Sequence, residues 1–210
     1  MSLTVAIPKG RLGTQTIKML KSTGIGNAID EKSRKLIFKD NERNIKFMLL
    51  KNSDVITYVE NGIADLGIAG KDMVMEKESD IYELYKMNIG KCKLSVAGIK
   101  GKKILTDDTI LKVATKFPET AKRYFKSKGQ KIKIIKLNGS IELAPILGLS
   151  DVIVDIVETG NTLKANGLEV FEDMYEISGM MISNKISYKF KRNEIKEVIE
   201  LIRKEDEKND

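Results

Sequence analysis

The sequence predicts an α/β protein built from two lobes with mostly parallel sheets. Short apolar segments typical of buried strands alternate with amphipathic helical segments along the chain, which is the pattern of parallel α/β architectures. The predicted strands are too many for one sheet in 210 residues, so we expect two lobes with a break near residues 89–93. No low-complexity linker marks this break.

The first half of the chain contains three predicted strands, at residues 3–8, 45–50 and 64–70. The first strand leads into a helix over residues 14–21, in which Ile17 and Leu20 share one face. The second leads into a helix for which Ser53 is the expected N-cap.

The second half continues the alternation, with strands predicted at residues 93–99, 112–117, 131–137, 151–157 and 178–188. Pro118 is expected at the first position of a helix that ends at Gly129, and residues 138–148 form a short helix after a tight turn. The tail after residue 191 reads as an amphipathic helix whose apolar face comprises Ile195, Val198, Ile199 and Ile202.

The composition excludes several kinds of chemistry. The chain has no histidine, which excludes Ser-His, Cys-His and His-metal sites. Cys92 is the single cysteine, so no internal disulfide can form, and we interpret it as a small buried hydrophobe. Any metal would be a hard cation held by carboxylates or carried by a phosphorylated ligand.

The net charge of +7 suits a polyanionic partner. Nucleic acid is not expected, because aromatic residues make up only 6% of the chain and do not interleave with basic residues. A phosphate-rich small molecule is the functional interpretation, and a solvated lysine-rich surface remains the alternative.

The sequence predicts a cytoplasmic protein that does not enter a membrane. No apolar run approaches the ~20 residues that a membrane helix needs. The N-terminal residues 1–10 lack the basic segment and long apolar core of a signal peptide. One cysteine also fits a reducing compartment.

The segment that follows the strand at residues 151–157 carries the clearest site signal. Thr159, Gly160, Asn161 and Thr162 offer hydroxyl, amide and backbone donors where a strand ends, and this is where α/β sheets bind ligands. Such donors suit a phosphomonoester. Asp155 and Glu158 suit sugar hydroxyls or a bridging Mg²⁺ instead. Together they describe a ribose 5-phosphate site, although an ordinary capped turn with a solvated acidic edge explains the spacing equally well.

Five segments in one order resemble those of the ATP phosphoribosyltransferase family, which opens histidine biosynthesis. They are IPKGRL (7–12), SRKLIF (33–38), ADLGIAGKD (64–72), LNGSIELAP (137–145) and DIVETGNTLKANGLEV (155–170). The resemblance runs from about residue 3 to residue 190. The resemblance is specific because all five segments occur in the order in which the family has them. The TGNT loop alone would not be specific, because many phosphoribosyl-binding proteins carry a similar loop.

The resemblance implies two lobes like those of a type II periplasmic binding protein, with the active site in the cleft and the C-terminal segment returning to the first lobe. We expect residues 1–91 and 178–210 to form lobe I, on the nucleotide and diphosphate side. Residues 92–177 are expected to form lobe II, which carries the 5-phosphate loop.

The chain is similar to the short form of the family, because it ends near residue 210 without the C-terminal regulatory domain of the long form. Short-form members act with a histidyl-tRNA-synthetase-like regulatory subunit. The resemblance therefore implies a hetero-oligomer containing at least a homodimer of this chain. Histidine feedback is expected to need that second polypeptide.

The family reaction joins N1 of ATP to C1 of 5-phosphoribosyl 1-diphosphate and releases diphosphate. The resemblance makes Lys9, Arg11 and Arg34 the candidate catalytic cations, with Mg²⁺ carried by the substrate. It assigns the phosphoribosyl diphosphate to Asp155, Glu158, Thr159, Gly160, Asn161, Thr162 and Leu163, and the nucleotide to Gly70, Lys71 and Asp72. Glu142 is expected near the cleft, or else is an ordinary helix N-terminal acid.

Three other functions are compatible with this architecture. A phosphoribosyltransferase that acts on a free base is the alternative enzyme, and competition between ATP and free bases would distinguish the two. A solute-binding protein is the alternative without chemistry, and a ligand-responsive regulator is a third. Diphosphate release would distinguish the two enzymes from the solute-binding protein and from the regulator.

Overall fold

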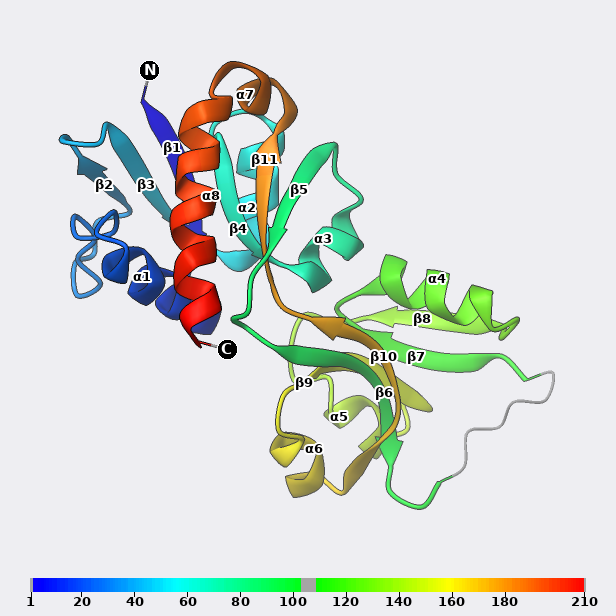
Figure 1. Cartoon of the computed structure of the whole chain (residues 1–210). Helices are drawn as coiled ribbons and strands as arrows, with labels where there is room; N and C mark the ends of the chain where they lie inside the picture. The colour runs from blue at the N-terminus through cyan, green and yellow to red at the C-terminus, as the bar shows by residue number, and fades with distance from the viewer. Residues whose placement is uncertain (1, 103–108, 210) are drawn as a thin grey trace. The chain divides into compact units, whose positions relative to one another are not determined.

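A computed structural model of the chain describes residues 2–102 and 109–209 (Figure 1). The chain divides into two compact units: unit 1 is Met1–Gly90 with Ser178–Asp210, and unit 2 is Lys91–Ile177. Each unit contains one sheet with helices packed on it, which confirms the α/β class with two sheets. The predicted lobes also included residues 1, 103–108 and 210, which lie outside the described residues.

The sheet of unit 1 has six strands in the order β2-β3-β1-β4-β11-β5. Their bounds are β1 Leu3–Pro8, β2 Ile37–Asp40, β3 Ile45–Leu50, β4 Leu66–Gly70, β5 Ile81–Lys86 and β11 Gly179–Asn184. The neighbours β3, β1 and β4 are parallel, whereas β2, β11 and β5 pair antiparallel. All six residues of β1 are buried, as expected of a central strand whose two faces are both covered by helices.

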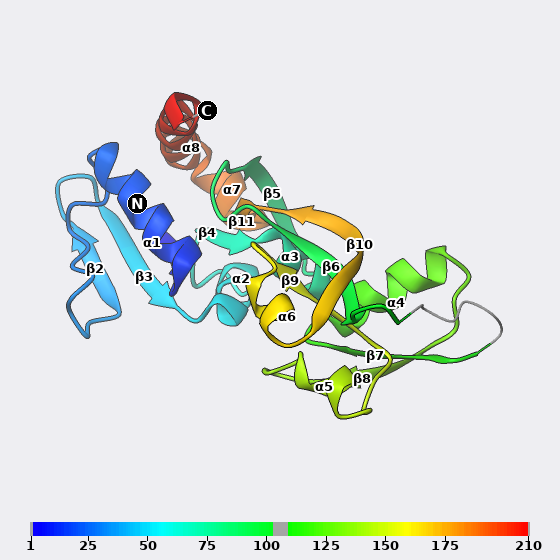
Figure 2. The same cartoon turned by 90° about the horizontal axis from the view of Figure 1, so that it is seen from below.

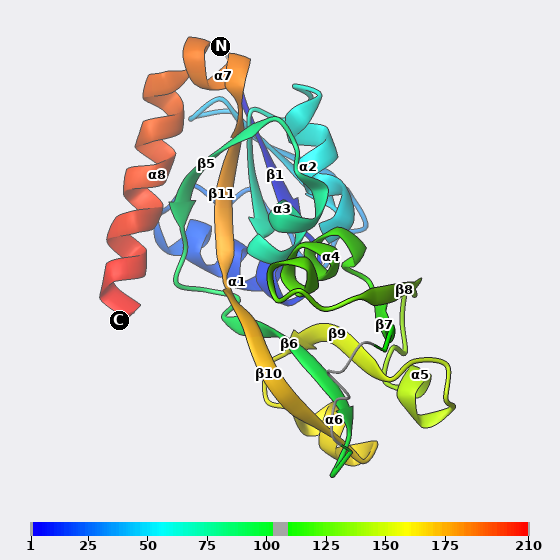
Figure 3. The ribbon, with the colours of Figure 1, turned by 90° about the vertical axis from the view of Figure 1, so that its right-hand side faces the viewer.

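Helices cover both faces of this sheet (Figure 3). Helices α1 (Arg11–Ser22) and α8 (Arg192–Asp206) share one apolar core with the sheet, whereas α2 (Asn52–Glu60) and α3 (Lys71–Lys77) share the other. The short α7 (Lys185–Phe190) joins β11 to α8, and a 3₁₀ turn at Glu207–Asn209 follows α8. The tail helix is as predicted: Ile195, Val198 and Ile202 are buried.

The sheet of unit 2 has five strands in the order β10-β6-β9-β7-β8. Their bounds are β6 Cys92–Ile99, β7 Leu111–Thr115, β8 Ile132–Lys136, β9 Val152–Val157 and β10 Leu168–Ile177. The neighbours β9, β7 and β8 are parallel, and β6 and β10 pair antiparallel.

Three helices pack on the sheet of unit 2 (Figure 2). They are α4 (Pro118–Ser127), α5 (Leu143–Ile146) and α6 (Asn161–Ala165). Ala144 of α5 and Leu163 of α6 share an apolar core with Ile153 of β9. Pro118 begins its helix as predicted. Among the helices in residues 2–102 and 109–209, none combines the length and apolarity that crossing a membrane requires.

The prediction of mostly parallel sheets is wrong, because both sheets are mixed. The sheet of unit 1 has a parallel centre with antiparallel pairs toward both edges. In the sheet of unit 2, the parallel strands β9, β7 and β8 form one side and the antiparallel pairs form the other. The strands β2, β5 and β10 were not predicted from the sequence, and all three lie at sheet edges. An edge strand exposes polar side chains and lacks the continuous apolar run of a central strand, so the sequence signal is weak.

Several helix starts also differ from prediction. Helix α1 begins at Arg11 instead of residue 14, and α5 begins at Leu143 instead of residue 138. Ser53 lies within α2, where its Oγ donates to Asp54 Oδ1 at 2.8 Å, and Lys51 occupies the N-cap position. The strand predicted over residues 178–188 ends at Asn184, whose Oδ1 accepts hydrogen bonds from the N–H groups of Ile186 and Ser187 at 2.9 and 3.0 Å. This side-chain cap starts α7 in the middle of the predicted strand.

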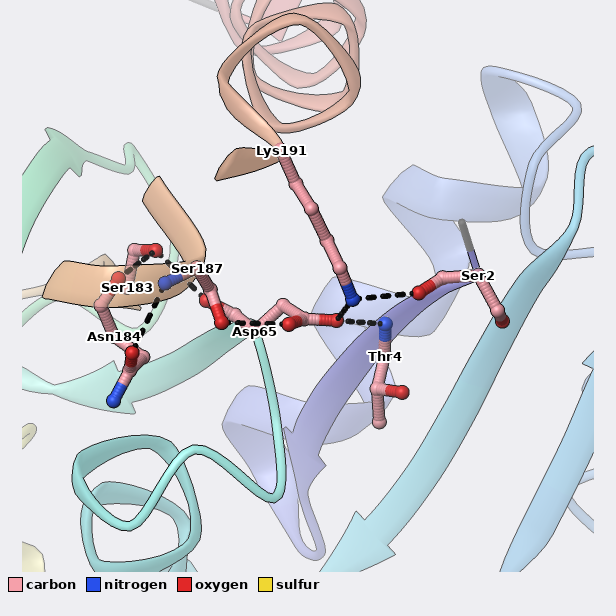
Figure 4. A network of polar contacts seen from close by, with 7 residues as sticks. All are labelled: Ser2, Thr4, Asp65, Ser183, Asn184, Ser187 and Lys191. Carbon is pink, nitrogen blue, oxygen red and sulfur yellow. Dashed lines mark hydrogen bonds and ion pairs between the residues drawn. The ribbon is translucent and has the colours of Figure 1, made fainter. Parts of the chain in front are cut away.

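A buried carboxylate ties the C-terminal segment to the sheet of unit 1 (Figure 4). Asp65 Oδ2 accepts from the Thr4 N–H at 2.8 Å and from Lys191 Nζ at 2.7 Å, and Asp65 Oδ1 accepts from Ser187 Oγ at 2.6 Å. The Asp65 side chain is only 8% exposed, so these hydrogen bonds and the ion pair replace the water that would otherwise solvate the carboxylate. Residues more than 120 positions apart in sequence thereby meet at one ion pair.

Lys191→Met is expected to lower the free energy of unfolding by about 3 kcal/mol, because it leaves the Asp65 carboxylate buried without its cation. Lys185→Met is the matched control: it breaks the pair that Lys185 forms with Asp80, whose side chain is 78% exposed, and should change little. Urea unfolding of both variants measures the difference. Equal losses would show that the Asp65–Lys191 pair does not anchor the tail.

Candidate functional site

The parallel centre of unit 1 gathers several predicted residues at one edge. Strands β3, β1 and β4 are parallel neighbours, so their carboxyl ends share one edge of the sheet. Lys9 follows β1 directly, and Lys71 follows β4. This is the edge at which α/β sheets bind ligands.

Helix α1 begins almost on the end of β1. Gly10 has φ = 91°, and a Cβ on Gly13 would lie 1.6 Å from the Pro8 carbonyl oxygen, so only glycine permits this close approach. Helical hydrogen bonding starts where the Thr14 N–H donates to Gly10 O at 3.0 Å. The N–H groups before Thr14 therefore form a positive helix end that faces the ligand edge.

Lys9 and Arg34 line one cavity of about 230 Å³ beside this helix start. Gly10, Gly13 and Thr14 contribute to the same wall. The structure thus brings together two cations separated by a 24-residue stretch of sequence, and adds a helix N-terminus to them. Arg11, the first residue of α1, is not one of the described residues that line the cavity.

The Gly70–Asp72 segment forms the junction between β4 and α3. A Cβ on Gly70 would lie 2.1 Å from Asp72 Oδ1, so the carboxylate covers the glycine backbone. Lys71 Nζ lies 2.5 Å from Glu83 Oε2, and the Lys71 N–H donates to Ser178 O at 3.0 Å. These contacts hold the junction in one conformation.

In unit 2, the loop after β9 turns sharply into α6. Gly160 has φ = 72°, a left-handed conformation that favours glycine. The Asn161 N–H donates to Thr159 Oγ1 at 3.4 Å, and the Lys164 N–H donates to Gly160 O at 3.0 Å. Leu163 is buried in the core, so only its backbone is suited to meet a ligand.

A cavity of about 380 Å³ opens beside this loop. Glu158, Thr159, Gly160 and Leu163 line it together with two lysines that the sequence did not single out, Lys93 and Lys164. Lys93 comes from β6, where its Nζ lies 2.5 Å from Asp173 Oδ2. This hydrogen-bonded pair raises the pKa of Lys93 and lowers the pKa of Asp173.

Asp155 lies in β9, opposite Ser95 of β6 in the antiparallel register. Burial raises the pKa of its carboxyl, opposed by a hydrogen bond from the Ile156 N–H and by the charge of Lys116. The charge of Glu142, the residue before α5, raises this pKa further. Asp155, Glu142 and Lys116 therefore belong to one electrostatic neighbourhood at the end of β9.

Sequence reasoning missed Lys116, Lys93 and Lys164. Lys116 directly follows β7, whose carboxyl end lies at the same edge as that of β9 because the two strands are parallel. The rule that ligands bind beyond the carboxyl ends of strands could have found it. Nothing local in the sequence points to Lys93, because it reaches the cavity only through the pairing of β6 with β9.

The described residues contain no group of three or more His, Cys, Asp or Glu side chains placed to hold a metal ion. Asp155 and Glu158 offer carboxylate oxygens, which are the ligand type that Mg²⁺ prefers. Mg²⁺ usually keeps several waters and shares substrate phosphates. These two carboxylates fit a cation that a diphosphate carries, with the protein supplying one or two ligands.

Three comparisons with known proteins bear on this geometry. The model of the family described as HisG, ATP phosphoribosyltransferase, matches residues 51–204. A protein of Clostridioides difficile (strain 630) named ATP phosphoribosyltransferase is 61% identical over 199 residues, which cover 95% of this chain and 96% of that protein. A protein of the same name from Caldicellulosiruptor bescii is 51% identical, with 90% and 92% of the two chains covered.

Solved structures show the same fold. A chain of the ATP phosphoribosyl transferase (HisG:HisZ) complex from Thermotoga maritima superimposes with a TM-score of 0.84 at 38% identity, covering 98% of both chains. The periplasmic aliphatic sulphonate binding protein SsuA from Escherichia coli superimposes with a TM-score of 0.64 at 16% identity, covering 98% of this chain and 72% of that one. The second likeness concerns the fold alone and confirms the resemblance to periplasmic binding proteins.

Proposed function

The chain belongs to the ATP phosphoribosyltransferase family, and we propose that its two units divide the substrates of that reaction between them. The enzyme is a glycosyltransferase: it transfers the 5-phosphoribosyl group from 5-phosphoribosyl 1-diphosphate to N1 of ATP and releases diphosphate, the first step of histidine biosynthesis. The observation that carries the division is the placement of the two cavities, one lined by Lys9 and Arg34 in unit 1 and one lined by Thr159 and Gly160 in unit 2.

The chemistry needs no histidine. Adenine N1 attacks with a neutral lone pair, so no proton has to leave first. The energetic demand falls on the leaving diphosphate, which gains negative charge while the ribosyl carbon gains positive charge. Fixed cations that face the diphosphate meet that demand, because they stabilise charge that develops in the transition state.

The loop of unit 2 is proposed to bind the 5-phosphate. Its support is the left-handed Gly160, which precedes α6 beside a cavity that Thr159, Gly160 and Leu163 line. The backbone N–H groups of Asn161 to Leu163 and the hydroxyls of Thr159 and Thr162 are the donors that this loop offers a phosphate. Lys164, in the cavity wall, adds a cation. Asp155 and Glu158 are proposed to accept hydrogen bonds from the ribose hydroxyls, with Glu142 as a neighbour of Asp155.

The cations of unit 1 are proposed to receive the diphosphate. Lys9 and Arg34 share one cavity with the N-terminus of α1, and Arg11 begins that helix. The guanidinium of Arg34 can contact two phosphate oxygens at once, whereas Lys9 acts as a point charge. Mg²⁺ bound to the diphosphate would neutralise part of its charge, with Asp155 or Glu158 as the protein ligands.

The Gly70–Asp72 junction is proposed to hold the nucleotide. It follows β4, the parallel neighbour of β1, and so lies at the same sheet edge as Lys9. The amide-rich start of α3 suits a phosphate or a ribose hydroxyl. The Lys71–Glu83 contact leaves that lysine partly neutralised, which favours an orienting role over a catalytic one.

A second subunit is proposed to regulate this chain. The Thermotoga maritima relative was solved as a HisG:HisZ complex, and the chain covers 98% of the aligned relative. We therefore propose a hetero-oligomer of the same kind, in which a histidyl-tRNA-synthetase-like subunit and a homodimer of this chain assemble. Location in the cytoplasm is part of the same proposal.

The reaction assignment is tested with the purified chain, ATP, 5-phosphoribosyl 1-diphosphate and Mg²⁺. Diphosphate release that depends on ATP, with formation of N1-phosphoribosyl-ATP seen by mass spectrometry, is the expected result. Adenine, guanine and other free bases serve as competing acceptors. Release with a free base and none with ATP would replace the assignment with the free-base enzyme.

Asp155→Asn is expected to stabilise the fold while it lowers activity. Because burial raises the carboxyl pKa above its ordinary 3.8, the folded protein binds a proton more tightly than the unfolded chain does. Stability is then lost as pH rises through the folded pKa, and an amide escapes this loss. Thermal unfolding should show a higher Tm than wild type at pH 7 and a smaller difference toward pH 4.

Asp151→Asn, in the same unit, controls for the loss of one negative charge. It should leave activity near the wild-type level, because Asp151 accepts from the Lys112 N–H at 2.9 Å through an oxygen that asparagine retains. A less stable Asp155→Asn protein at pH 7 would contradict the burial argument. Full activity of the Asp155→Asn variant would remove Asp155 from the site.

A further inference from the structure

Lys116 lies beside Asp155 at the ligand edge of unit 2. Strands β7 and β9 are parallel neighbours in which Thr115, the last residue of β7, lies opposite Val154. The next residue along each strand direction is Lys116 on one side and Asp155 on the other. The register of the sheet therefore makes a lysine the neighbour of the carboxylate that is proposed to bind the ribose hydroxyls.

Both residues extend the same face of the sheet. Residues two positions apart along a strand share a face. Ala114 and Ile153, two positions before Lys116 and Asp155, belong to the apolar core that α5 and α6 cover. Electrostatics agree with this placement: burial raises the pKa of the Asp155 carboxyl, and the charge of Lys116 opposes that rise.

Hydrogen bonds on both sides of Lys116 fix its backbone. Thr115 Oγ1 donates to Val154 O at 2.7 Å and accepts from the Phe117 N–H at 2.9 Å. The Leu137 N–H donates to Thr115 O at 3.0 Å. Thr115 and Phe117 are buried, whereas Lys116 between them is exposed. The fold thus presents this one side chain at the end of the strand.

The Lys116 ammonium has no partner within residues 2–102 and 109–209, where it forms no hydrogen bond or ion pair. Other lysines of unit 2 are already paired: Lys93 with Asp173, and Lys128 with Glu172. Lys116 is therefore a cation that a ligand can reach without first breaking one of these contacts.

The strand order places Lys116 and the phosphate loop on opposite sides of Asp155. The strands follow the order β10-β6-β9-β7-β8, and Asp155 lies in β9. The cavity beside the loop at residues 159–163 is lined by residues of β6 and β10, which lie on one side of β9. Lys116 follows β7, which lies on the other side.

The groups of 5-phosphoribosyl 1-diphosphate have a matching order. The 5-phosphate and the 1-diphosphate leave opposite ends of the ribose, and the two free hydroxyls lie between them. With the 5-phosphate in the loop and the hydroxyls on Asp155, the diphosphate is directed toward the β7 side. A lysine there can contact diphosphate oxygens as a point charge, without the fixed geometry that a guanidinium requires.

We infer that Lys116 binds the 1-diphosphate of the substrate within unit 2. This inference rests on the proposed function and adds a residue to it. Because Lys116 contacts a charge that is already present in the bound substrate, it contributes to affinity more than to kcat. The competing role is that of a positioning residue, in which Lys116 only keeps the Asp155 carboxyl ionised. That role would affect every ligand that uses the ribose hydroxyls.

The test compares two ligands, 5-phosphoribosyl 1-diphosphate and ribose 5-phosphate, by titration calorimetry of the purified chain with Mg²⁺. Lys116→Met keeps a long side chain and removes the charge, and it is expected to bind 5-phosphoribosyl 1-diphosphate at least about tenfold more weakly. Ribose 5-phosphate has no diphosphate, so its affinity should stay at the wild-type value. Lys116→Arg should retain most of the affinity for 5-phosphoribosyl 1-diphosphate, because it restores the cation.

Lys112→Met is the matched control. Lys112 is an exposed lysine of the same strand, four residues before Lys116 and away from the carboxyl edge. It should bind both ligands as wild type does, and thermal unfolding of all variants checks that they fold.

Three results would overturn the inference. They are an unchanged affinity of Lys116→Met for 5-phosphoribosyl 1-diphosphate, equal weakening of both ligands, which would assign Lys116 to Asp155, and the same loss in Lys112→Met. Binding is measured without ATP, and diphosphate release by wild type in the presence of ATP is measured in parallel. Lys116-dependent binding without transfer to ATP would therefore contradict the proposed reaction and support the inference.

Discussion

Gly160→Val is expected to raise the KM for 5-phosphoribosyl 1-diphosphate about a hundredfold in a protein that still folds. Space is not the reason, because a Cβ on Gly160 would meet only Val157 Cγ1, at 3.9 Å. The reason is that φ = 72° is strained for a β-branched residue, so the loop must leave the left-handed conformation. Loss of two charge-assisted hydrogen bonds to the phosphate costs about 3 kcal/mol, which corresponds to that factor.

Gly167→Val is the matched control for this prediction. Gly167 follows the other end of α6, has φ = 70°, and a Cβ there would meet nothing within 4 Å. Both variants should lose similar thermal stability, because both place valine in the same strained conformation. Only Gly160→Val should lose affinity for the phosphoribosyl substrate. A folded Gly160→Val protein with a normal KM would exclude the loop from the site.

Arg34→Ala is expected to lower kcat about a hundredfold and to leave the affinity for ATP almost unchanged. The guanidinium is proposed to meet charge that appears only as diphosphate departs, so its removal weakens the transition state more than the bound substrates. Lys9→Ala should show the same signature, because Lys9 lines the same cavity. Arg34→Lys should rescue only in part, since an ammonium cannot form the two-point contact.

Lys39→Ala provides the comparison for these cation variants. Lys39 is an exposed lysine of β2 in the same unit and is not among the described residues that line the cavity. It should keep the wild-type kcat, which separates the position of Arg34 and Lys9 from the general effect of removing one positive charge. Steady-state kinetics at fixed ionic strength and direct ATP binding measure both quantities. Collapse of ATP affinity with normal kcat in Arg34→Ala would move that residue to the nucleotide.

The central elements of both sheets could be predicted from the sequence, and the edges could not. Strand β1 is buried on both faces and is visible as a nearly continuous apolar run, whereas β5 and β10 expose several polar residues and depend on neighbours distant in sequence. The start of α7 was also not predictable, because it depends on tertiary structure more than on a local apolar pattern. Its start depends on the Asn184 cap, but the preceding apolar strand residues suggested that the strand continued.

The candidate site divides in the same way. The loop at Gly160 is local, so its turn into a helix follows from the glycine and the adjacent hydroxyl residues. Lys93 could not be found in this manner, since it reaches the loop through the register of β6 on β9. The raised pKa of Asp155 also depends on packing, because burial between sheet and helices is its largest cause. Sequence predicts which chemical groups a loop offers, and tertiary pairing decides which other groups join them.

The order of strands in unit 1 has a consequence for synthesis on the ribosome. Strand β5 pairs only with β11 among the described strands, and β11 lies between β4 and β5. All of unit 2 is translated between those two partners. A nascent chain therefore exposes one side of β4 and an unpaired β5 until residues 179–184 emerge, whereas the continuous unit 2 can fold as soon as its own last strand is made. The segment inserted in the middle of the sequence is thus the first part of the molecule able to complete its fold.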